Sequence, residues 1–238
     1  AESSEPIVHD LNRDVGRKAL LGDDADKMLE SEIYGFRVQP GDDASCRNLY
    51  RPSQPRVLGV TEDFIDHFNL KPGAKRHQPA FRFAASAAKT ADERSNPWHL
   101  LAANSTAAGA GKTIPVVLDK NTAMYSLRLY RGIGEEFTVN YQNGQTVTFR
   151  VVGLLAESLL QGSLLIREDD FLQLFPRRSG FQFFLLNLRS EQPQQLVSLL
   201  EDRLGDEGFD VSDSQTRLTE LFAVQNTYIS TFQSLGGL

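Results

Sequence analysis

The sequence comes nearest to a chemical motif at residues 108–113, which read AGAGKT. The end of this run matches a Walker loop, G-x-x-x-x-G-K-[ST], whose backbone amides, lysine and hydroxyl bind nucleotide phosphates. However, Thr106 stands where the first glycine of that motif belongs. Residues 114–118 are mostly β-branched and include a proline, so they predict a strand and not the helix N-terminus that would bind the anion. We therefore expect a glycine-rich loop, with nucleotide binding through Lys112 and Thr113 as the alternative.

The remaining candidates for a nucleophile or a metal ligand lack the neighbouring residues that catalysis or metal binding would require. Cys46 is the only cysteine, so the chain forms no internal disulfide or cysteine-rich zinc site, and no histidine lies near it in sequence to activate it. The acidic pairs Asp23-Asp24 and Asp42-Asp43 lack the alternating acids and glycine of a calcium loop, so we assign them to helix starts and turns. The sequence contains no G-x-S-x-G or H-E-x-x-H motif. We therefore predict no catalytic site, metal or cofactor.

Composition and net charge limit the classes of protein to which the chain could belong. The 238 residues are 40% hydrophobic and 24% charged, which is typical of a globular chain with one large or two small domains. The net charge of −6 argues against a nucleic-acid partner, because such proteins present basic surface to phosphates. The sequence has no apolar run of about 18 residues, the length of a membrane-spanning helix. Because it starts at Ala1 without methionine or signal peptide, we expect an excised part of a longer protein.

Periodicity and capping residues predict the elements of the first half of the chain. Residues 1–6 are polar and form either a mobile end or the tail of a strand. Residues 86–95, rich in alanine and charge, predict a loop. The other segments are bounded by caps, prolines and glycines: helix 11–21 capped by Asp10 and ended by Gly22, helix 25–32 capped by Asp24, strands 33–38 and 56–60, helix 62–69, strand 81–83, and a short helix from Pro97 capped by Asn96, with Trp98 in the core.

A hairpin is predicted around Asn143-Gly144. Hydrophobic residues alternate with polar ones on both sides, at Phe137, Val139, Tyr141, Val147, Phe149 and Val151. A two-residue Asn-Gly loop would pair Val139 with Thr148 and divide the apolar residues between both faces. A three-residue loop over 142–144, with Gly144 left-handed, pairs Val139 with Val147 and buries one continuous face. We therefore predict the three-residue loop.

The region after the hairpin alternates strands and helices. A short strand over 164–166 leads into a helix over 168–175 that Pro176 ends. Residues 181–188, FQFFLLNL, are nearly all apolar, which predicts an interior strand covered on both faces. Pro193 opens a helix that Gly205 ends, and a strand over 209–211 completes a βαβ unit.

The end of the sequence differs from the rest in charge. Apolar residues recur at three- and four-residue spacing over 213–235, which predicts one long helix with Asp213 or Ser214 as its cap. Residues 221–238 contain no charged residue and no histidine. A helix about to enter lipid avoids charge. Burial against the domain or against a partner subunit is the alternative explanation.

Three stretches of this sequence resemble one family. The runs IGEEFTV (133–139), FRVVGLLAESLLQGSLLIREDDFLQLFP (149–176) and ELFAVQNTYISTFQSLGGL (220–238) are similar to the extracytoplasmic region of FtsX/MacB-type ABC transporter permeases. In that family a G-(D/E)-x-hydrophobic strand and a V-V-G strand precede a segment that closes in F-x-x-x-F/L-P. An N-T-Y-x-x-x-F-x-x-L-G-G-L run opens the next membrane helix.

The resemblance implies a non-catalytic domain between two membrane helices of the same chain, on the periplasmic or outer side of a bacterial inner membrane. Its partners would be an ABC ATPase subunit and a second permease copy or paralogue, and no nucleic acid. It would couple ATP hydrolysis to export, extraction or partner activation through its last helix, whose membrane-proximal residues we expect at Gln225, Asn226, Tyr228 and Phe232. The alternatives are a soluble ligand-binding domain, or a nucleotide-binding protein that uses residues 108–113.

The expected fold is α+β with two subdomains and a long C-terminal helix. A porter-like part, with the βαβ unit, would combine residues 1–50 with residues 181–238. A mainly β part, with its antiparallel hairpin at 136–152, would span residues 51–180. Residues 86–111, rich in alanine and glycine, have no counterpart in the resemblance. The substrate class therefore stays open.

Overall fold

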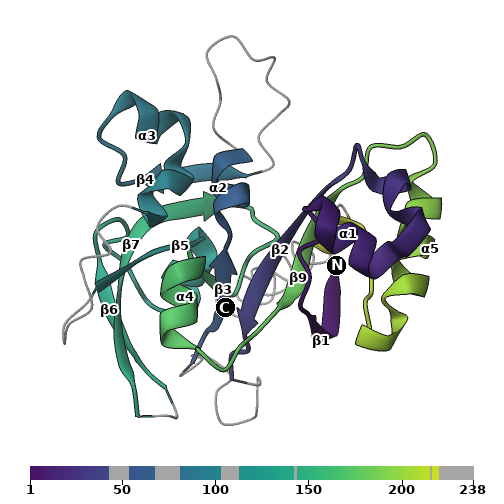
Figure 1. The fold of residues 1–238 in the computed structure, drawn as a ribbon. Helices are drawn as coiled ribbons and strands as arrows, with labels where there is room; N and C mark the ends of the chain where they lie inside the picture. The colour runs from purple at the N-terminus through teal and green to yellow at the C-terminus, as the bar shows by residue number, and fades with distance from the viewer. Residues whose placement is uncertain (43–53, 68–80, 103–112, 142–143, 215, 220–238) are drawn as a thin grey trace, which may run out of the picture.

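The computed structural model describes residues 1–42, 54–67, 81–102, 113–141, 144–214 and 216–219. The fold is mixed α+β, as predicted. Its strands form one path of hydrogen-bonded neighbours in the order β1-β9-β2-β3-β8-β5-β7-β4, and β6 pairs with β7 (Figure 1). Among the described residues, no helix has the length and apolar character needed to cross a bilayer.

The elements have the following bounds. The strands are β1 (Glu2–Ile7), β2 (Glu32–Gln39), β3 (Arg56–Val60), β4 (Arg82–Ser86), β5 (Thr113–Asp119), β6 (Glu136–Asn140), β7 (Thr146–Ala156), β8 (Ser163–Arg167) and β9 (Phe181–Asn187). The α-helices are α1 (Asp14–Leu21), α2 (Glu62–His67), α3 (Ala91–Ser95), α4 (Glu168–Leu174) and α5 (Pro193–Arg203). Short 3-10 helices are η1 (Gly22–Met28), η2 (Pro97–Leu101) and η4 (Gly205–Glu207), and η3 (Thr122–Ser126) is a π-helical turn.

Strand β2 joins two regions of the molecule. Its residues 32–36 pair with β9 and its residues 37–39 pair with β3, both antiparallel. We call residues 1–36 and 181–213, with β1, β9, α1 and α5, the end region. We call the described residues from 54 to 174 the middle region. The predicted division into subdomains, with boundaries at residues 50 and 180, stays a prediction, and one path of strands runs through both regions.

The middle region has a hydrophobic core on each face of its sheet. Along β8, Leu164 and Ile166 belong to the core under α4, whereas Leu165 belongs to the core that contains Trp98. Trp98 is 1% exposed, and its ring lies edge-on to that of Phe64 with 5.0 Å between centroids. The prediction of Trp98 as a core residue is therefore confirmed. The side chain of Asn96 caps η2, as predicted, by accepting the N–H of Trp98.

The β6–β7 hairpin has the predicted register. Val139 pairs with Val147 and Phe137 pairs with Phe149. Gly144 is left-handed, with a φ of +78°. The buried side chains Val139, Val147 and Phe149 all belong to one core. A one-residue slip would move them to the other face, so burial selects the three-residue loop.

Strand β9 lies between β1 and β2 and is buried on both faces, as its apolar sequence predicted. Phe184 packs in the core of the end region under α1 and α5, whereas Phe183 joins the Trp98 core of the middle region. Gly35 of β2 permits the close approach of β9, because a Cβ at this position would lie 2.8 Å from the ring of Phe181. The two regions therefore share a core on one side of the sheet.

Several predicted elements of the end region have other bounds or types. For residues 1–6 the second of the two predicted alternatives, a strand, is confirmed, because these residues form most of β1. Helix α1 begins at Asp14 and not at residue 11, because Asp10 instead accepts the N–H of Asn12 in a turn, at 2.8 Å. The 3-10 helix η1 takes the place of the predicted α-helix over 25–32. A helix could not extend to residue 32, because Glu32 is already part of β2. The predicted strand over 209–211 is reduced to one bridge, between Asp210 and Glu2.

The predicted loop over 86–95 contains a helix. Thr90 Oγ1 accepts the N–H of Glu93 at 3.2 Å, and Glu93 Oε2 accepts the N–H of Thr90 at 3.0 Å. This reciprocal pair is a capping box, which starts α3 although none of its residues is buried. Strand β4 also runs further than the predicted 81–83, from Arg82 to Ser86.

Candidate coupling site

Three charged side chains from distant parts of the sequence meet where β1 begins. The carboxylate of Glu2 accepts hydrogen bonds from Arg56 at the start of β3, at 3.3 Å from Nη1 and 3.4 Å from Nη2. It also accepts one from Arg217 Nη2, at 3.0 Å. Arg217 belongs to the helical turn that follows Asp213. We call Glu2, Arg56 and Arg217 the Glu2 site.

Backbone pairing fixes Glu2 beside the segment that leads to Arg217. The N–H of Glu2 donates to the carbonyl of Asp210 at 3.0 Å, and the N–H of Asp210 donates to the carbonyl of Glu2 at 2.9 Å. The N–H of Ser4 donates to the carbonyl of Gly208 at 3.3 Å. Gly208 has a φ of +64°, and a Cβ there would lie 2.8 Å from Ser4 Oγ. Glycine is therefore required for this close approach of the segment to β1.

Asp213 begins the helical turn that carries Arg217. Its Oδ2 accepts hydrogen bonds from the N–H of Thr216 at 2.8 Å and from the hydroxyl of Thr216 at 3.0 Å. Its carbonyl accepts the N–H of Arg217 at 3.0 Å. Of the two predicted caps, Asp213 and Ser214, the structure uses Asp213. The cap sets the direction of this turn and thereby brings Arg217 onto Glu2.

Burial and charge act in opposite directions on the Glu2 site. Burial opposes the ionisation of Glu2, but the charges of Arg56 and Arg217 and the hydrogen bonds they donate outweigh it and keep the pKa of Glu2 below its ordinary value. Burial lowers the pKa of Arg56, and the Glu2 carboxylate opposes that shift. The guanidinium of Arg56 also lies over the ring of Phe183, 5.1 Å from its centroid. The pairing of Glu2 with both arginines is therefore present at neutral pH.

A small cavity of about 60 Å³ lies beside the Glu2 site, and Arg56, Arg217, Phe183 and Ser163 contribute to its lining. The Nε atom of Arg56 is buried and has no hydrogen-bond partner within the described part of the chain. An unsatisfied buried donor destabilises the arrangement that contains it. The Glu2 site thus connects the helical turn to the body through the two Nη atoms of Arg56 and leaves its Nε atom unsatisfied.

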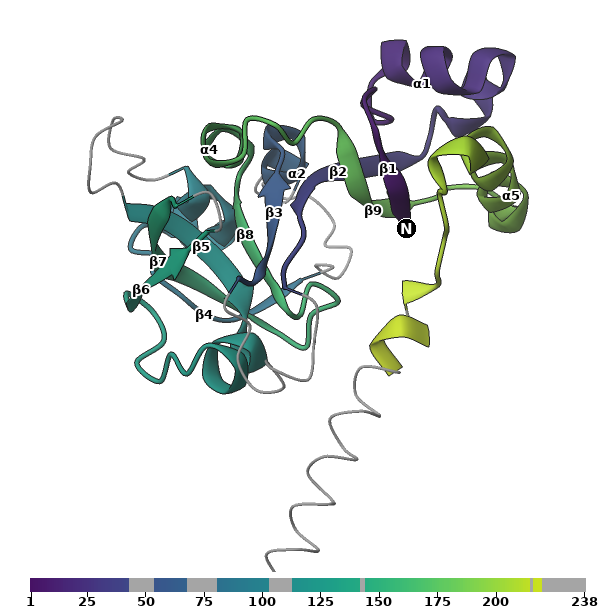
Figure 2. The same cartoon turned by 90° about the horizontal axis from the view of Figure 1, so that it is seen from below.

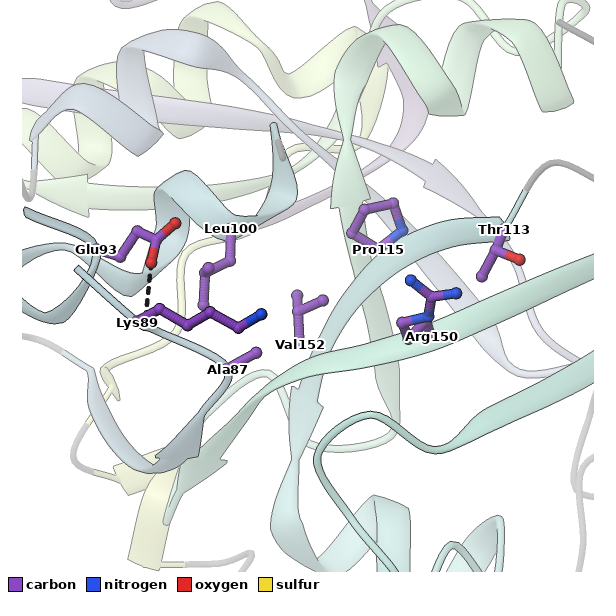
Figure 3. A pocket seen from close by; sticks show the side chains of 8 residues that line it. All are labelled: Ala87, Lys89, Glu93, Leu100, Thr113, Pro115, Arg150 and Val152. Carbon is purple, nitrogen blue, oxygen red and sulfur yellow. Dashed lines mark hydrogen bonds between the residues drawn. The ribbon is translucent and has the colours of Figure 1, made fainter. Parts of the chain in front are cut away.

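A second cavity, of about 370 Å³, lies in the middle region (Figure 3). Its apolar lining comes from Ala87, Leu100, Pro115 and Val152. Two basic side chains lie on either side of Val152, Lys89 beside α3 and Arg150 on β7 (Figure 3). Arg150 also pairs with Glu136, at 2.6 Å. Glu93 lines the cavity as well, so an otherwise mostly apolar lining carries two basic side chains and one acidic side chain.

The predicted membrane-proximal residues Gln225, Asn226, Tyr228 and Phe232 lie outside the described residues, as do Lys112 and Cys46. The predicted helix over 213–235 is described only at residues 214 and 216–219, which are helical. Thr113 begins β5, so a strand follows the glycine-rich run as predicted, and not the helix N-terminus of a Walker loop. Within the ranges that the structure describes, no cluster of three or more His, Cys, Asp or Glu side chains could hold a metal ion.

The sequence does not single out the residues of the Glu2 site or the two basic residues of the larger cavity. Glu2 and its arginine partners are 54 and 215 positions apart, so no local spacing marks them. The one usable signal is glycine at position 208, directly before the predicted strand over 209–211.

Comparison with known proteins found no matching protein-family model and no matching curated protein sequence. Several solved structures are similar to the chain, among them the two that follow. One is the extracellular domain of the noncanonic ABC-type transporter YknZ from Gram-positive bacteria, with 12% identity, a TM-score of 0.39 and coverage of 81% of this chain and 82% of that one. The other is the periplasmic region of MacB from Actinobacillus actinomycetemcomitans, with 14% identity, a TM-score of 0.39 and coverage of 80% and 75%. At these scores neither similarity carries an argument about function, which we base on this chain's own residues.

Proposed function

We propose that the chain is a non-catalytic extracytoplasmic domain of an ABC transporter permease of the FtsX/MacB type. It lies between two membrane helices of one protein, on the periplasmic or outer side of a bacterial inner membrane. Its partners are an ABC ATPase subunit and a second permease copy or a paralogue. The sequence resemblance suggests this role, and the geometry of the Glu2 site supports it.

The observation that carries the proposal is that the segment leading to Asp213 lies beside the start of β1, and the helical turn after Asp213 follows just beyond the N-terminus (Figure 2). Reciprocal backbone hydrogen bonds join Glu2 to Asp210, and the Glu2 side chain pairs with Arg217. A domain inserted between two membrane helices needs its two connecting segments on one side of its body. The pairing of these two segments meets that requirement.

The Glu2 site also gives the last helix a point at which to act on the body. A helix transmits rotation or a push along its length, because its residues are hydrogen-bonded turn by turn, whereas a loop does not. A displacement of Arg217 acts on Glu2 in the end region and, through the shared carboxylate, on Arg56 in the middle region. Motion driven by ATP hydrolysis at the membrane would therefore change how the two regions meet.

Alanine insertions in the full-length protein test this coupling. Each alanine inserted after Gln225 rotates the rest of the predicted helix by about 100° and moves it by about 1.5 Å along its axis relative to the Glu2 site. We expect insertions of one to four alanines to abolish the extracytoplasmic activity while the ATPase subunit still hydrolyses ATP. The same insertions after Ser179, an exposed turn residue, are the control and should preserve the activity. Normal activity with every insertion after Gln225 would refute the coupling role.

Labelling of intact cells tests the location. Lys18 is exposed on α1, so a Lys18→Cys substitution, made together with Cys46→Ser, gives a single thiol within these 238 residues. We expect a membrane-impermeant maleimide to label it in intact cells that express the full-length protein. Labelling only after lysis would place the domain in the cytoplasm.

The larger cavity favours a second candidate, a domain that binds a ligand with an apolar part and with polar groups that face Lys89, Glu93 and Arg150. Native mass spectrometry after mild purification should then show a retained molecule. Substitution of Lys89 and Arg150 by glutamine should remove it, because these residues bring positive charge to the lining. Lys18→Gln with Arg177→Gln, which changes the net charge equally elsewhere, is the control. A native chain that carries no ligand would argue against this candidate.

A further inference from the structure

The segment from Lys120 to Arg131 carries basic and aromatic side chains into solvent, and we call it the basic-aromatic segment. Its sequence, KNTAMYSLRLYR, contains three basic residues and no acid, in a chain with a net charge of −6. Tyr125 and Tyr130 are 73% and 75% exposed, although tyrosine rings are usually half-buried or more. Lys120, Arg128 and Arg131 are also exposed. Arg131 also lies 4.0 Å from a carboxylate oxygen of Glu135. The exposure of both rings and all three basic side chains makes this segment a candidate contact surface.

The exposure follows from how the segment is anchored. Leu127 and Leu129 are buried in the core of the middle region, so the residues that alternate with them point outward. One of these, Arg128, has a φ of +58°, which is uncommon for a residue with a side chain. The buried leucines fix the backbone of the segment, and the side chains of the two tyrosines and the arginines extend from it into solvent.

Hydrogen bonds tie the start of the segment to the turn between β7 and β8. The buried carboxylate of Asp119 accepts the N–H of Asn121 at 2.8 Å and the N–H of Ser158 at 3.2 Å. The hydroxyl of Thr122 accepts the N–H of Gly162 at 2.8 Å. The segment is therefore a fixed part of the surface.

The same turn contacts the Glu2 site from its other side. Leu159, Leu160, Gln161 and Ser163 line the small cavity together with Arg56 and Arg217. The basic-aromatic segment and the start of the last helix therefore lie on one side of the molecule. Figure 2 shows both in its lower half, the segment as the teal helical turn and the helix start in yellow, with α1 and α4 at the opposite side.

We propose that the basic-aromatic segment binds the headgroup layer of an anionic phospholipid bilayer. This inference rests on the proposed function, in which the last helix leads to the membrane. Tyrosine is enriched at the level of the headgroups, where its ring meets apolar surface and its hydroxyl stays hydrated. Lysine and arginine near the surface are attracted by anionic lipids. The segment acts as a second contact with the bilayer, which orients the body relative to the last helix.

Binding of the 238-residue chain to vesicles tests this proposal. We expect it to float with vesicles of phosphatidylcholine and phosphatidylglycerol and to bind far less to phosphatidylcholine alone. The double variant Arg128→Gln/Arg131→Gln should lower the partition coefficient about 25-fold, at about fivefold for each arginine. Tyr125→Ser/Tyr130→Ser should weaken binding to both kinds of vesicle. Unchanged thermal unfolding of the variants would show that the fold is intact.

The matched control is Lys18→Gln/Arg177→Gln, which removes the same charge from α1 and from the turn after α4, on the opposite side (Figure 2). We expect this control to bind within twofold of the native chain. Equal loss in the control would show a net-charge effect, and native binding by the Arg128/Arg131 variant would show that the segment is not the contact. Either result overturns the inference. The maleimide labelling of Lys18→Cys in cells decides the location independently, so the inference and the proposed function can fail separately.

Discussion

The end region and the middle region are stabilised in different ways. The middle region comes from one stretch of the chain, and cores cover both faces of its sheet. The end region pairs strands from opposite parts of the chain, since Glu2 of β1 pairs with Phe183 of β9. The entropy of closing such a long loop must be offset by contacts between the two parts. The end region therefore depends on the contacts between residues 1–7 and residues 181–213.

The difference shows where a force would act first. Arg217 contacts Glu2 directly and reaches the middle region only through the shared carboxylate and the rim of the small cavity. The Trp98 core opposes separation of the regions, because Tyr34 and Phe36 of β2 and Phe183 of β9 are part of it. Under the proposed function, a displacement of the last helix would therefore act on the end region before it acts on the middle region.

The largest effect is expected from truncation in the shared core. Trp98→Ala should lower the free energy of unfolding by about 3–5 kcal/mol, because it leaves a cavity among Phe64, Phe81 and Phe83. Since this core includes strands of both regions, one cooperative transition should move to lower urea concentration. The control Tyr130→Ala removes an exposed ring and should change stability by less than about 0.5 kcal/mol. Two separate transitions in Trp98→Ala would show that the regions do not share a core energetically.

Substitution of a buried arginine should lower the stability of the end region without lowering that of the middle region. Arg17 donates to the carbonyls of Leu11 at 2.7 Å, Met28 at 2.8 Å and Ser31 at 2.9 Å. Arg17→Met leaves these buried acceptors without their donors, and we expect a loss of about 2–4 kcal/mol. Hydrogen exchange should become faster in α1 and β1 while β5 and β7 keep their protection. Lys18→Met on the same helix is exposed and serves as the control. Equal acceleration in β7 would remove the distinction between the regions.

The Glu2 site should contribute less, and in a pH-dependent way. The lowered pKa of Glu2 means that its contribution is fully present well above its unfolded value of 4.5 and is lost as pH falls through the lower folded pKa. Glu2→Gln should therefore lower stability by about 0.5–1 kcal/mol at pH 7, a small value because the side chain is 42% exposed and screened by solvent.

Urea titrations of native chain and Glu2→Gln variant between pH 7 and pH 3 measure this difference, which should shrink towards zero in acid. Glu5→Gln, on the exposed part of the same strand, is the control and should show no such trend. A stability difference between the two chains that stays constant with pH would mean that the carboxylate charge does not stabilise the Glu2 site.

The sequence was most informative where local chemistry decides the structure. The hairpin register followed from alternation and from the left-handed glycine at 144, and Pro193 placed the start of α5 correctly. Strand β3 also has the predicted bounds, 56–60. In each case the residues that set the element lie within it or directly beside it.

The sequence was least informative where distant residues meet. β1 is polar, and only its pairing with β9 and Asp210 makes it a strand. The ion pairs of the Glu2 site leave no periodic trace, because charged residues are as common in surface turns as in such clusters. In the sequence, Arg17 resembles any other basic residue of a helix. Only the structure shows the backbone carbonyls to which it donates hydrogen bonds. These features carry the proposed function, and sequence patterns do not reveal them.

The smallest effect is expected at α3, the part of the middle region that the cores do not reach. Its capping box joins Thr90 and Glu93, yet α3 buries none of its residues. Thr90→Ala should cost the helix about 1 kcal/mol, but global stability should change by less than half of that, since α3 can unfold locally. Hydrogen exchange should accelerate at residues 91–95 alone, and the neutral control Thr90→Ser should restore protection. A full loss of 1 kcal/mol in urea unfolding would instead show that α3 belongs to the cooperative middle region, and that the cavity lined by Lys89 and Glu93 is as rigid as the core beneath it.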